Sequence, residues 1–293
     1  MDNHLSKYLA FVRTVETGSF TKAARDLNYA QSSVSKMIAD LESDWGVTLL
    51  ERSRSGVYPT SAGKQILPLA RRILNDYREL EGCINQINGI KTGTIRIGTF
   101  ASTAINWLPN IFARFQKDYP DIEYEMLLGD YDEVEQWIED GRADCGFLRL
   151  PAKHNFDTVT LKKDEYKVVL PTGHPLAQSK TVKLTDLDGQ PFLLLERGGK
   201  TDISKLLEKN GVHPKIRFTT WEDFAIMAMA EKGLGIGILP AMILKRIPYK
   251  IEIRSLDPPC FREIGLAVKD LNRITPATQM FIKYMQYREI LTE

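Results

Sequence analysis

The sequence has few cysteines and no long apolar run. Its 293 residues include an odd number of widely spaced cysteines, Cys83, Cys145 and Cys260. This pattern indicates a reducing compartment rather than a disulfide framework. No apolar stretch reaches the roughly 18 residues of a membrane-spanning helix, and the first residues do not resemble a signal peptide. The sequence therefore predicts a cytoplasmic protein with no membrane partner.

Motifs for catalysis, metals and cofactors are missing as well. The histidines lie scattered, without the spacing of metal ligands, at His4, His154, His174 and His213. The run Gly198-Gly199-Lys200-Thr201 resembles the end of a phosphate-binding loop, but Leu194 stands where the first glycine of that loop is required. No Gly-x-Ser-x-Gly elbow occurs. We therefore predict no enzyme, no metal site and no cofactor.

Excess charge of either sign is also lacking. There are 39 Lys and Arg against 38 Asp and Glu, a net charge of +1. Any surface that attracts nucleic acid must therefore be a local patch. The length suggests about two or three domains, each able to bury its own core.

Residues 19–42 have the pattern of two helices that meet at a tight corner. Small and apolar residues recur at helical spacing on both sides of a break at 28–30, as Ala23, Ala24 and Leu27 and then Val34, Ile38 and Leu41. Asn28 tolerates the left-handed backbone that such a turn needs. The pattern predicts a helix-turn-helix over about 19–38.

The second of these helices has a short polar face that no core requires. Gln side chains can bind adenine edges, and Ser and Lys can bind phosphates or bases. The alternative is a solvated helix face. We favour a DNA-binding face, with candidate residues Ser19, Thr21, Gln31, Ser32, Ser33, Ser35 and Lys36.

A small hairpin should follow this helix. Residues 47–50 are predicted to form a strand, and residues 51–60 a turn and a returning strand. Arg52 and Arg54 lie near the expected tip, where they can reach phosphates or the minor groove. The alternative is a solvated basic turn.

The next segment has a heptad seam. Apolar residues alternate spacings of four and three, as Ile66, Ala70, Ile73, Tyr77, Leu80, Ile84 and Ile87. Such a stripe either packs on its own domain or meets a second copy of the chain. We predict a long helix over 61–90 that joins two copies, and a hinge at 88–93.

From residue 94 the pattern changes to alternating strands and helices, which favours an α/β domain with a mainly parallel sheet. Strands are predicted at 95–98, 122–128, 143–148, 167–170, 192–195, 216–218, 234–240 and 264–268. Helices are predicted at 107–115, 134–138, 203–209, 222–232 and about 276–291.

Several runs together resemble the LysR-type transcriptional regulators. They include Ser19-Phe20, Ala23-Ala24, Gln31-Ser32-Ser33-Val34-Ser35 and Thr60-Ser61-Ala62-Gly63, and further on His174-Pro175 and 233–240. Ser32 and Leu50 depart from the family pattern, which often has Pro and usually has Phe there. The resemblance implies a helix-rich winged helix-turn-helix at 1–60, a linker helix at 61–90 and an effector domain at 91–293. That domain would have two α/β lobes of the type 2 periplasmic-binding-protein kind, at about 91–162 with 265–293 and about 163–264.

The resemblance further implies partners and a mechanism. Dimers, and tetramers formed through the effector domains, would bind inverted-repeat operator DNA, and a small-molecule effector would alter DNA bending or contact with RNA polymerase. Two rival hypotheses are a solute-binding protein that serves a transporter and an architectural DNA-binding protein with a vestigial cleft. The 90 residues before the α/β pattern argue against the first.

A ligand in an open α/β sheet binds beyond the carboxyl ends of the strands. This rule gives as candidate effector-binding residues Thr99, Phe100, Ala101, Ser102, Thr103, Gly129, Asp130, Arg149, Glu196, Arg197, Thr220 and Trp221. Arg149 is the predicted clamp for an anionic, carboxylate-bearing effector, and the alternative for it is a surface salt bridge. Phe100 and Trp221 favour an apolar or ring-bearing ligand. Asp130 and Glu196 would disfavour a multiply charged anion unless they face away.

Overall fold

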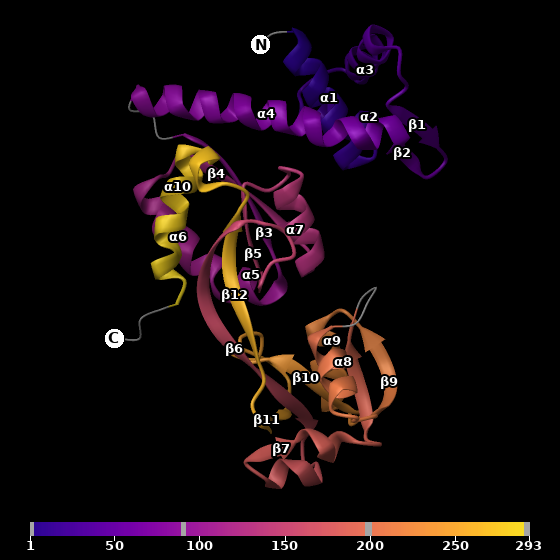
Figure 1. Cartoon of the computed structure of the whole chain (residues 1–293), viewed down its shortest axis with the longest axis vertical. Helices are drawn as coiled ribbons and strands as arrows, with labels where there is room; N and C mark the ends of the chain where they lie inside the picture. Colours follow the sequence, from indigo (N-terminus) through magenta and orange to yellow (C-terminus); the bar gives the residue numbers. More distant parts are fainter. Residues whose placement is uncertain (1–2, 89–91, 197–200, 290–293) are drawn as a thin grey trace.

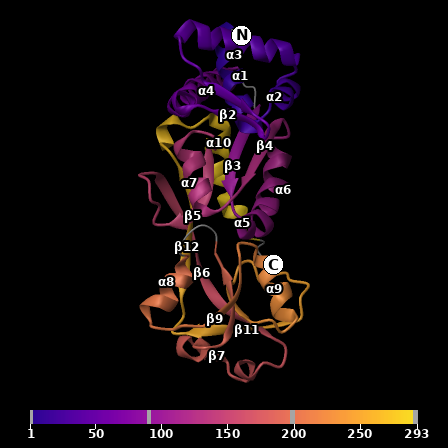
Figure 2. The same ribbon diagram turned by 90° about the vertical axis from the view of Figure 1, so that its right-hand side faces the viewer.

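The computed structural model describes residues 3–88, 92–196 and 201–289, and arranges them as a small helical module, a long helix and two α/β lobes (Figure 1). The helical module and the long helix lie at one end of the molecule. Lobe I lies in the middle, and lobe II forms the other end (Figure 2). The predicted order of the parts along the chain is therefore confirmed.

The N-terminal module packs three helices against a hairpin. The helices are α1 (Asn3–Thr17), α2 (Phe20–Asp26) and α3 (Gln31–Trp45), and the strands are β1 (Leu50–Ser53) and β2 (Gly56–Pro59). Phe11, Val34 and Leu41 are fully buried between them. The strand predicted at 47–50 begins only at Leu50. The backbone N–H groups of Leu49 and Leu50 instead donate to the Glu42 carboxylate, at 2.6 and 3.1 Å.

Helix α4 (Ser61–Ile87) runs without interruption through Pro68 and ends close to the predicted boundary. Residues 89–91 of the predicted hinge lie outside the described part of the chain. None of the described helices, this longest one included, is long and apolar enough to span a membrane.

Lobe I is built on four strands in the order β4 (Ile122–Leu128), β3 (Gly93–Thr99), β5 (Cys145–Leu150) and β12 (Phe261–Val268). The first three are parallel and β12 is antiparallel to β5. The helices are α5 (Ala101–Asn106), α6 (Leu108–Asp118), α7 (Tyr131–Glu139) and α10 (Pro276–Lys283). The helix predicted over about 276–291 is therefore too long, because α10 ends at Lys283 and a 3-10 turn, Tyr284–Tyr287, follows it.

Lobe II has a parallel trio in the order β10 (Ile236–Pro240), β8 (Pro191–Leu195) and β9 (Lys215–Thr220). Two strands that the sequence did not predict, β7 (Thr181–Lys183) and β11 (Ile251–Asp257), complete its sheet. Helices α8 (Asp202–Lys209) and α9 (Asp223–Glu231) belong to this lobe. Ile226 and Met227 are buried on the inner face of α9.

Strand β6 (Asp157–Pro171) joins the two lobes. Its residues 157–165 pair with β12, and its later residues pair with β10 and β11. The sequence predicted only 167–170, which includes the buried Val168, Val169 and Leu170, because the first residues of β6 are exposed and mostly polar. The lobe boundaries predicted at 162/163 and 264/265 fall inside the continuous strands β6 and β12.

The α4 helix is attached to lobe I. Arg71 is buried between Glu16 of α1 and Asp140 at the end of α7, at 3.4 Å from each carboxylate. Asn75 Nδ2 donates to the Gly141 carbonyl at 2.8 Å. Gly141 has φ +69°, and a Cβ there would lie 2.3 Å from that amide nitrogen, so only glycine fits this contact. The N-terminal module and α4 therefore rest on lobe I.

Candidate DNA-binding face and ligand cavity

The corner between α2 and α3 has the geometry that the sequence predicted. Ser19 caps α2 and accepts from the backbone N–H of Lys22 at 3.4 Å. Asn28 has φ 57°, the left-handed conformation expected of it in the turn. Ala23 and Ala24 are buried where the two helices cross, because only small residues allow a close approach there. This corner therefore sets the angle between α2 and α3.

The first turns of α3 present polar side chains to solvent. Gln31, Ser32 and Lys36 are exposed, and Ser33 and Ser35 are half-buried. Thr21 of α2 is exposed beside them, whereas Ser19 is half-buried by its role as a cap. The buried residues of α3 are Val34, Ile38 and Leu41, so the polar face points away from the core.

The two arginines of the hairpin differ in their contacts. Arg52 Nη2 donates to Ser35 Oγ at 3.2 Å, and the guanidinium lies 4.4 Å from the centroid of the Phe20 ring. Arg52 therefore lies against α2 and α3 rather than at the tip. Arg54 is exposed in the turn between β1 and β2. The contact with Ser35 places Arg52 beside the polar face of α3.

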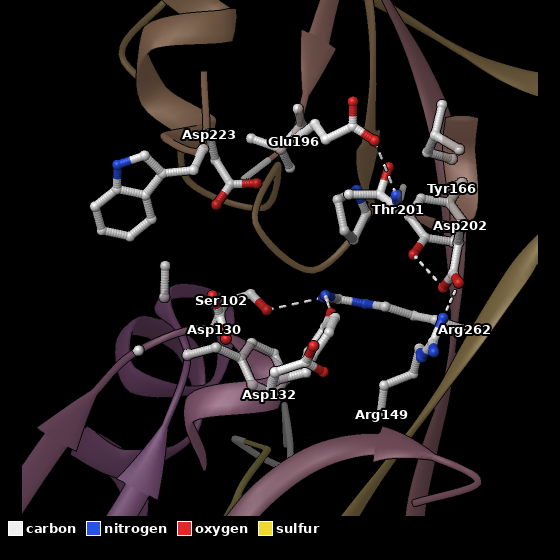
Figure 3. A pocket seen from close by; sticks show the side chains of 18 of the residues that line it. Ser102, Asp130, Asp132, Arg149, Tyr166, Glu196, Thr201, Asp202, Asp223 and Arg262 are labelled. Carbon is white, nitrogen blue, oxygen red and sulfur yellow. Dashed lines mark hydrogen bonds and ion pairs between the residues drawn. The ribbon is translucent and has the colours of Figure 1, made fainter. Parts of the chain in front are cut away.

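A cavity of about 520 Å³ lies between the lobes, where β6 and β12 cross from one lobe to the other (Figure 3). Its floor in lobe I is the start of α5 and of α7, and its roof in lobe II is formed by the ends of β8 and β10 and the starts of α8 and α9. This size suits a small organic ligand.

Arg262 of β12 is the central polar residue of this cavity. It is 5% exposed, and Nε and Nη2 donate to Asp164 Oδ2 at 2.9 and 2.7 Å. Nη2 also donates to Ser102 Oγ at 2.8 Å, and Nη1 donates to the Tyr131 hydroxyl. Burial alone lowers the pKa of Arg262, but Tyr131, Asp164 and Tyr166 together raise it above its usual range. The guanidinium is therefore permanently charged and ties lobe I to the crossing strands.

Arg149 at the end of β5 contacts the opposite lobe. Its guanidinium forms an ion pair with Asp202 at the start of α8, and it lies 5.9 Å from the centroid of the Tyr131 ring. Asp202 also accepts from the Tyr166 hydroxyl at 3.2 Å. The predicted carboxylate clamp thus already holds a carboxylate of its own chain, and this ion pair spans the two lobes beside the cavity (Figure 3).

Comparisons with known proteins agree with this architecture. The model of the lysR-family bacterial regulatory helix-turn-helix protein matches residues 5–64, and the model of the LysR substrate binding domain matches residues 88–288. The chain belongs to the LysR family. It is a DNA-binding transcriptional regulator with an effector domain, and its relatives are regulators rather than enzymes.

Two relatives align along most of the chain. YvbU of Bacillus subtilis, an uncharacterised HTH-type transcriptional regulator, is 33% identical over 95% of this chain and 96% of its own. LrrA of Synechococcus elongatus, a probable HTH-type regulator, is 36% identical over 87% of this chain and 86% of its own. Full-length OxyR of Pseudomonas aeruginosa with a cysteine-to-aspartate substitution has a TM-score of 0.76 at 20% identity, covering 98% of this chain and 97% of that chain. At that identity the similarity supports the fold alone.

Several predicted effector residues of this LysR-family chain do line the cavity, namely Phe100, Ala101, Ser102, Gly129, Asp130, Arg149, Glu196 and Trp221. Two of them have structural roles as well. Asp130 caps α7 and accepts from the N–H of Glu133 at 2.8 Å. Glu196 Oε1 accepts from the N–H of Thr201 at 3.1 Å and from Ser204 Oγ at 2.7 Å, which holds the start of α8.

Other predicted residues lie elsewhere. Thr99 and Thr103 are fully buried with their hydroxyls 2.7 Å apart, so they support the β3–α5 turn from behind and are not part of the lining. The Thr220 hydroxyl accepts from the N–H of Glu222 at 3.2 Å and is also outside the lining. Arg197 lies outside the described residues.

Sequence reasoning missed the residues that dominate the cavity, namely Arg262, Tyr131, Asp202 and Asp223. A signal for Arg262 was present, because it alternates with the buried Ile264 and Leu266 and so points to their face of β12. The predicted strand began at 264, two residues too late to include it. Among the described residues, no cluster of histidine, cysteine or carboxylate side chains could hold a metal ion.

The predicted dimer seam of α4 needs a correction at its first two positions. Ala70 is 3% exposed and, with Ile66, packs into the core of the N-terminal module. The exposed apolar side of the helix instead begins at Leu69 and continues through Ile73, Leu80, Ile84 and Ile87, with Tyr77 half-buried. Ile66 and Ala70 face the core because this part of α4 packs against α1 and the hairpin.

Proposed function

We propose that this LysR-family regulator binds inverted-repeat operators in the cytoplasm as a dimer or tetramer, and that a small molecule in the interlobe cavity modulates its contacts with DNA or RNA polymerase. The observation that carries the proposal is the exposed polar start of α3 beside the basic hairpin. An α-helix with this face fits the major groove, and a neighbouring hairpin reaches the phosphates.

The α4 helix supports a symmetric assembly. Its apolar stripe, defined here as Leu69, Ile73, Leu80, Ile84 and Ile87, has exposed fractions between 44% and 84%. An apolar row of this length on a two-fold-related helix forms a self-complementary interface. Two paired copies then present two α3 helices, which predicts an operator with two-fold symmetry. Full-length CbnR has been solved with its target DNA and matches 98% of this chain, with a TM-score of 0.65.

The cavity supports the response to an effector. A ligand between the lobes contacts both, so its binding free energy depends on the angle between them. Only such a difference in affinity between two conformations can shift their populations. The same reasoning requires that operator DNA changes the affinity for the effector by the same factor.

The test starts with selection of DNA from a random duplex library by the full-length protein. We expect enriched sequences to contain an inverted repeat. A Leu80→Glu, Ile84→Glu double variant should sediment as a monomer, because it places charges in the paired stripe, and it should bind the repeat no more tightly than a single half-site. The matched control is Arg72→Glu, which changes an exposed residue of α4 outside the stripe.

Two results would contradict the proposal. One is enrichment of sequences without any symmetry. The other is a double variant that keeps the assembly state and the operator affinity of the unmodified protein.

A further inference from the structure

The charge of the described part of the cavity lining does not favour an anionic ligand. Among the described residues that line it, seven are acidic and four are basic. The acidic excess alone decides nothing, because carboxylates in a protein wall are often bound to backbone N–H groups or to cations. The deciding question is which of these charges already has a partner within the chain.

The basic residues are largely compensated. Arg262 is paired with Asp164, and Arg149 with Asp202. Lys153 Nζ lies 2.6 Å from Asp132 Oδ1 at the exposed edge. Lys205 is exposed at the start of α8. An incoming anion would therefore have to displace a carboxylate of the chain itself at Arg149, Arg262 or Lys153, and it would still face the acidic excess.

Most of the acidic residues are engaged as well. Glu196 holds the start of α8, and Asp130 caps α7, as described above. Glu135 accepts from the N–H of Lys153 at 2.9 Å and lies 3.1 Å from His154 Nδ1. Glu222 caps α9 and accepts from the N–H of Phe224 at 3.4 Å. These carboxylates have structural roles that a ligand would have to disrupt.

Asp223, the first residue of α9, is different. Its carboxylate points into the cavity, facing Ser102 and Asp130 on the other lobe (Figure 3). Within the described part of the chain, no side chain forms a hydrogen bond or an ion pair with it. Burial raises the pKa of Asp223 to about 6, and the attraction of Arg262 only partly offsets that effect. The Asp223 carboxylate therefore faces the cavity without a directly bound cation from the described side chains, and Arg262 attracts it only from a distance.

The walls around this carboxylate are aromatic. Trp221, Phe100 and Tyr131 line the cavity, and the Phe100 and Tyr131 rings meet edge to face with centroids 4.9 Å apart. Aromatic faces attract cations and bury apolar groups, whereas their negative potential disfavours an anion placed over the ring.

We propose that the effector is an organic ammonium compound, in which a protonated amine binds Asp223 and an apolar or aromatic body lies against Trp221, Phe100 and Tyr131. This inference rests on the proposed function, because it identifies the ligand class of the same cavity. It replaces the anionic effector that the sequence predicted through Arg149.

The experiment compares matched probes that differ in charge but little in shape. These are 2-phenylethylamine against 3-phenylpropanoate, and tryptamine against indole-3-propanoate. Full-length protein is titrated with each probe by calorimetry, and thermal unfolding is followed in parallel. We expect the amines to bind and raise Tm, and the carboxylates to have no effect. Asp223→Asn, which keeps the size of the side chain, should weaken amine binding at least ten-fold.

The matched control is Glu263→Gln. Glu263 is an exposed carboxylate beside Arg262 that lies outside the cavity lining, so its removal tests for a general effect of charge. The inference is overturned if no amine binds, if the carboxylates bind in their place, or if Asp223→Asn retains amine affinity.

A readout of DNA binding on the same samples separates the inference from the function on which it rests. Carboxylates that alter DNA binding would leave the regulator function in place and overturn the amine class. Amines that bind through Asp223 without any effect on DNA binding would support the ligand class and contradict the effector response.

Discussion

The two ends of this molecule use arginine in opposite ways. At the DNA-binding end, Arg52 donates to a serine hydroxyl and lies on Phe20, and Arg54 is exposed in the hairpin turn. In the cavity, Arg149 and Arg262 are each paired with a carboxylate of the same chain. The comparison teaches that an arginine near a cleft does not by itself indicate an anionic ligand. Its partners within the chain decide whether its charge is available.

The largest effect should come from the cavity. We predict that Arg262→Ala lowers the free energy of unfolding by about 3–5 kcal/mol, because Asp164, which is 2% exposed, would remain as a buried charge without its partner. Denaturant unfolding measures this change. In the Arg262→Met, Asp164→Asn double variant most of the loss should be recovered. A small loss in Arg262→Ala would mean that the pair contributes less than its burial indicates.

Substitutions at the DNA-binding end should change the affinity for DNA rather than the free energy of unfolding. We predict that Gln31→Ala costs about 1–3 kcal/mol of binding to the selected operator and little on random duplex. Arg54→Ala should weaken binding to both, and it should lower the slope of log affinity against log salt by about one. Fluorescence anisotropy at several salt concentrations distinguishes the two. Equal loss on both duplexes for Gln31→Ala would contradict its proposed role in recognising bases.

Asp223 should give a pH-dependent effect. Its pKa is raised from 3.8 to about 6 in the folded state, so its ionised form destabilises the protein at neutral pH. As pH falls through about 6, the folded protein takes up the proton first, and that cost disappears by about pH 4. We predict that Asp223→Asn is more stable than the unmodified protein by about 1–2 kcal/mol at pH 7.5. Urea unfolding across this range should show the difference shrinking towards pH 4.

The smallest effect concerns Arg149. Its ion pair with Asp202 is partly exposed, with side-chain exposures of 30% and 26%. We predict a coupling energy below about 1 kcal/mol in a double-mutant cycle of Arg149→Ala and Asp202→Ala. A coupling energy as large as that between Arg262 and Asp164 would contradict the expectation that a partly exposed ion pair contributes less than a buried one.

Much of the fold follows from local sequence signals. The helix-turn-helix was predictable because small residues at the crossing, Asn28 in the turn and the apolar spacing of α3 all favour the same structure. Strand 122–128 was predicted with its observed bounds. The signals failed where tertiary contacts decide: Glu42 delays the start of β1, and the exposed half of β6 is held by its pairing with β12.

The cavity was harder to predict than the fold. The rule that ligands bind beyond the carboxyl ends of strands located Phe100, Ser102 and Arg149 in the lining. It could not show that Asp202 pairs with Arg149, since the two residues come from different lobes and lie far apart in the sequence. Nor could it place Arg262, because this residue lies near the start of β12, which is antiparallel to β5 and β6. Charge compensation depends on such distant pairs, so the sign of the ligand charge could not be inferred from lining residues alone.

The contact between Asn75 and Gly141 has a mechanical consequence for signalling. It joins α4 to the end of α7, and the Arg71 and Asp76 ion pairs to Asp140 and Arg273 join the same helix to lobe I. Lobe I is therefore fastened to the helix that carries the DNA-binding module, whereas lobe II connects to lobe I through β6 and β12. Under the proposed effector response, a change in the angle between the lobes would move lobe II relative to the DNA-binding module and leave the attachment of lobe I to α4 in place.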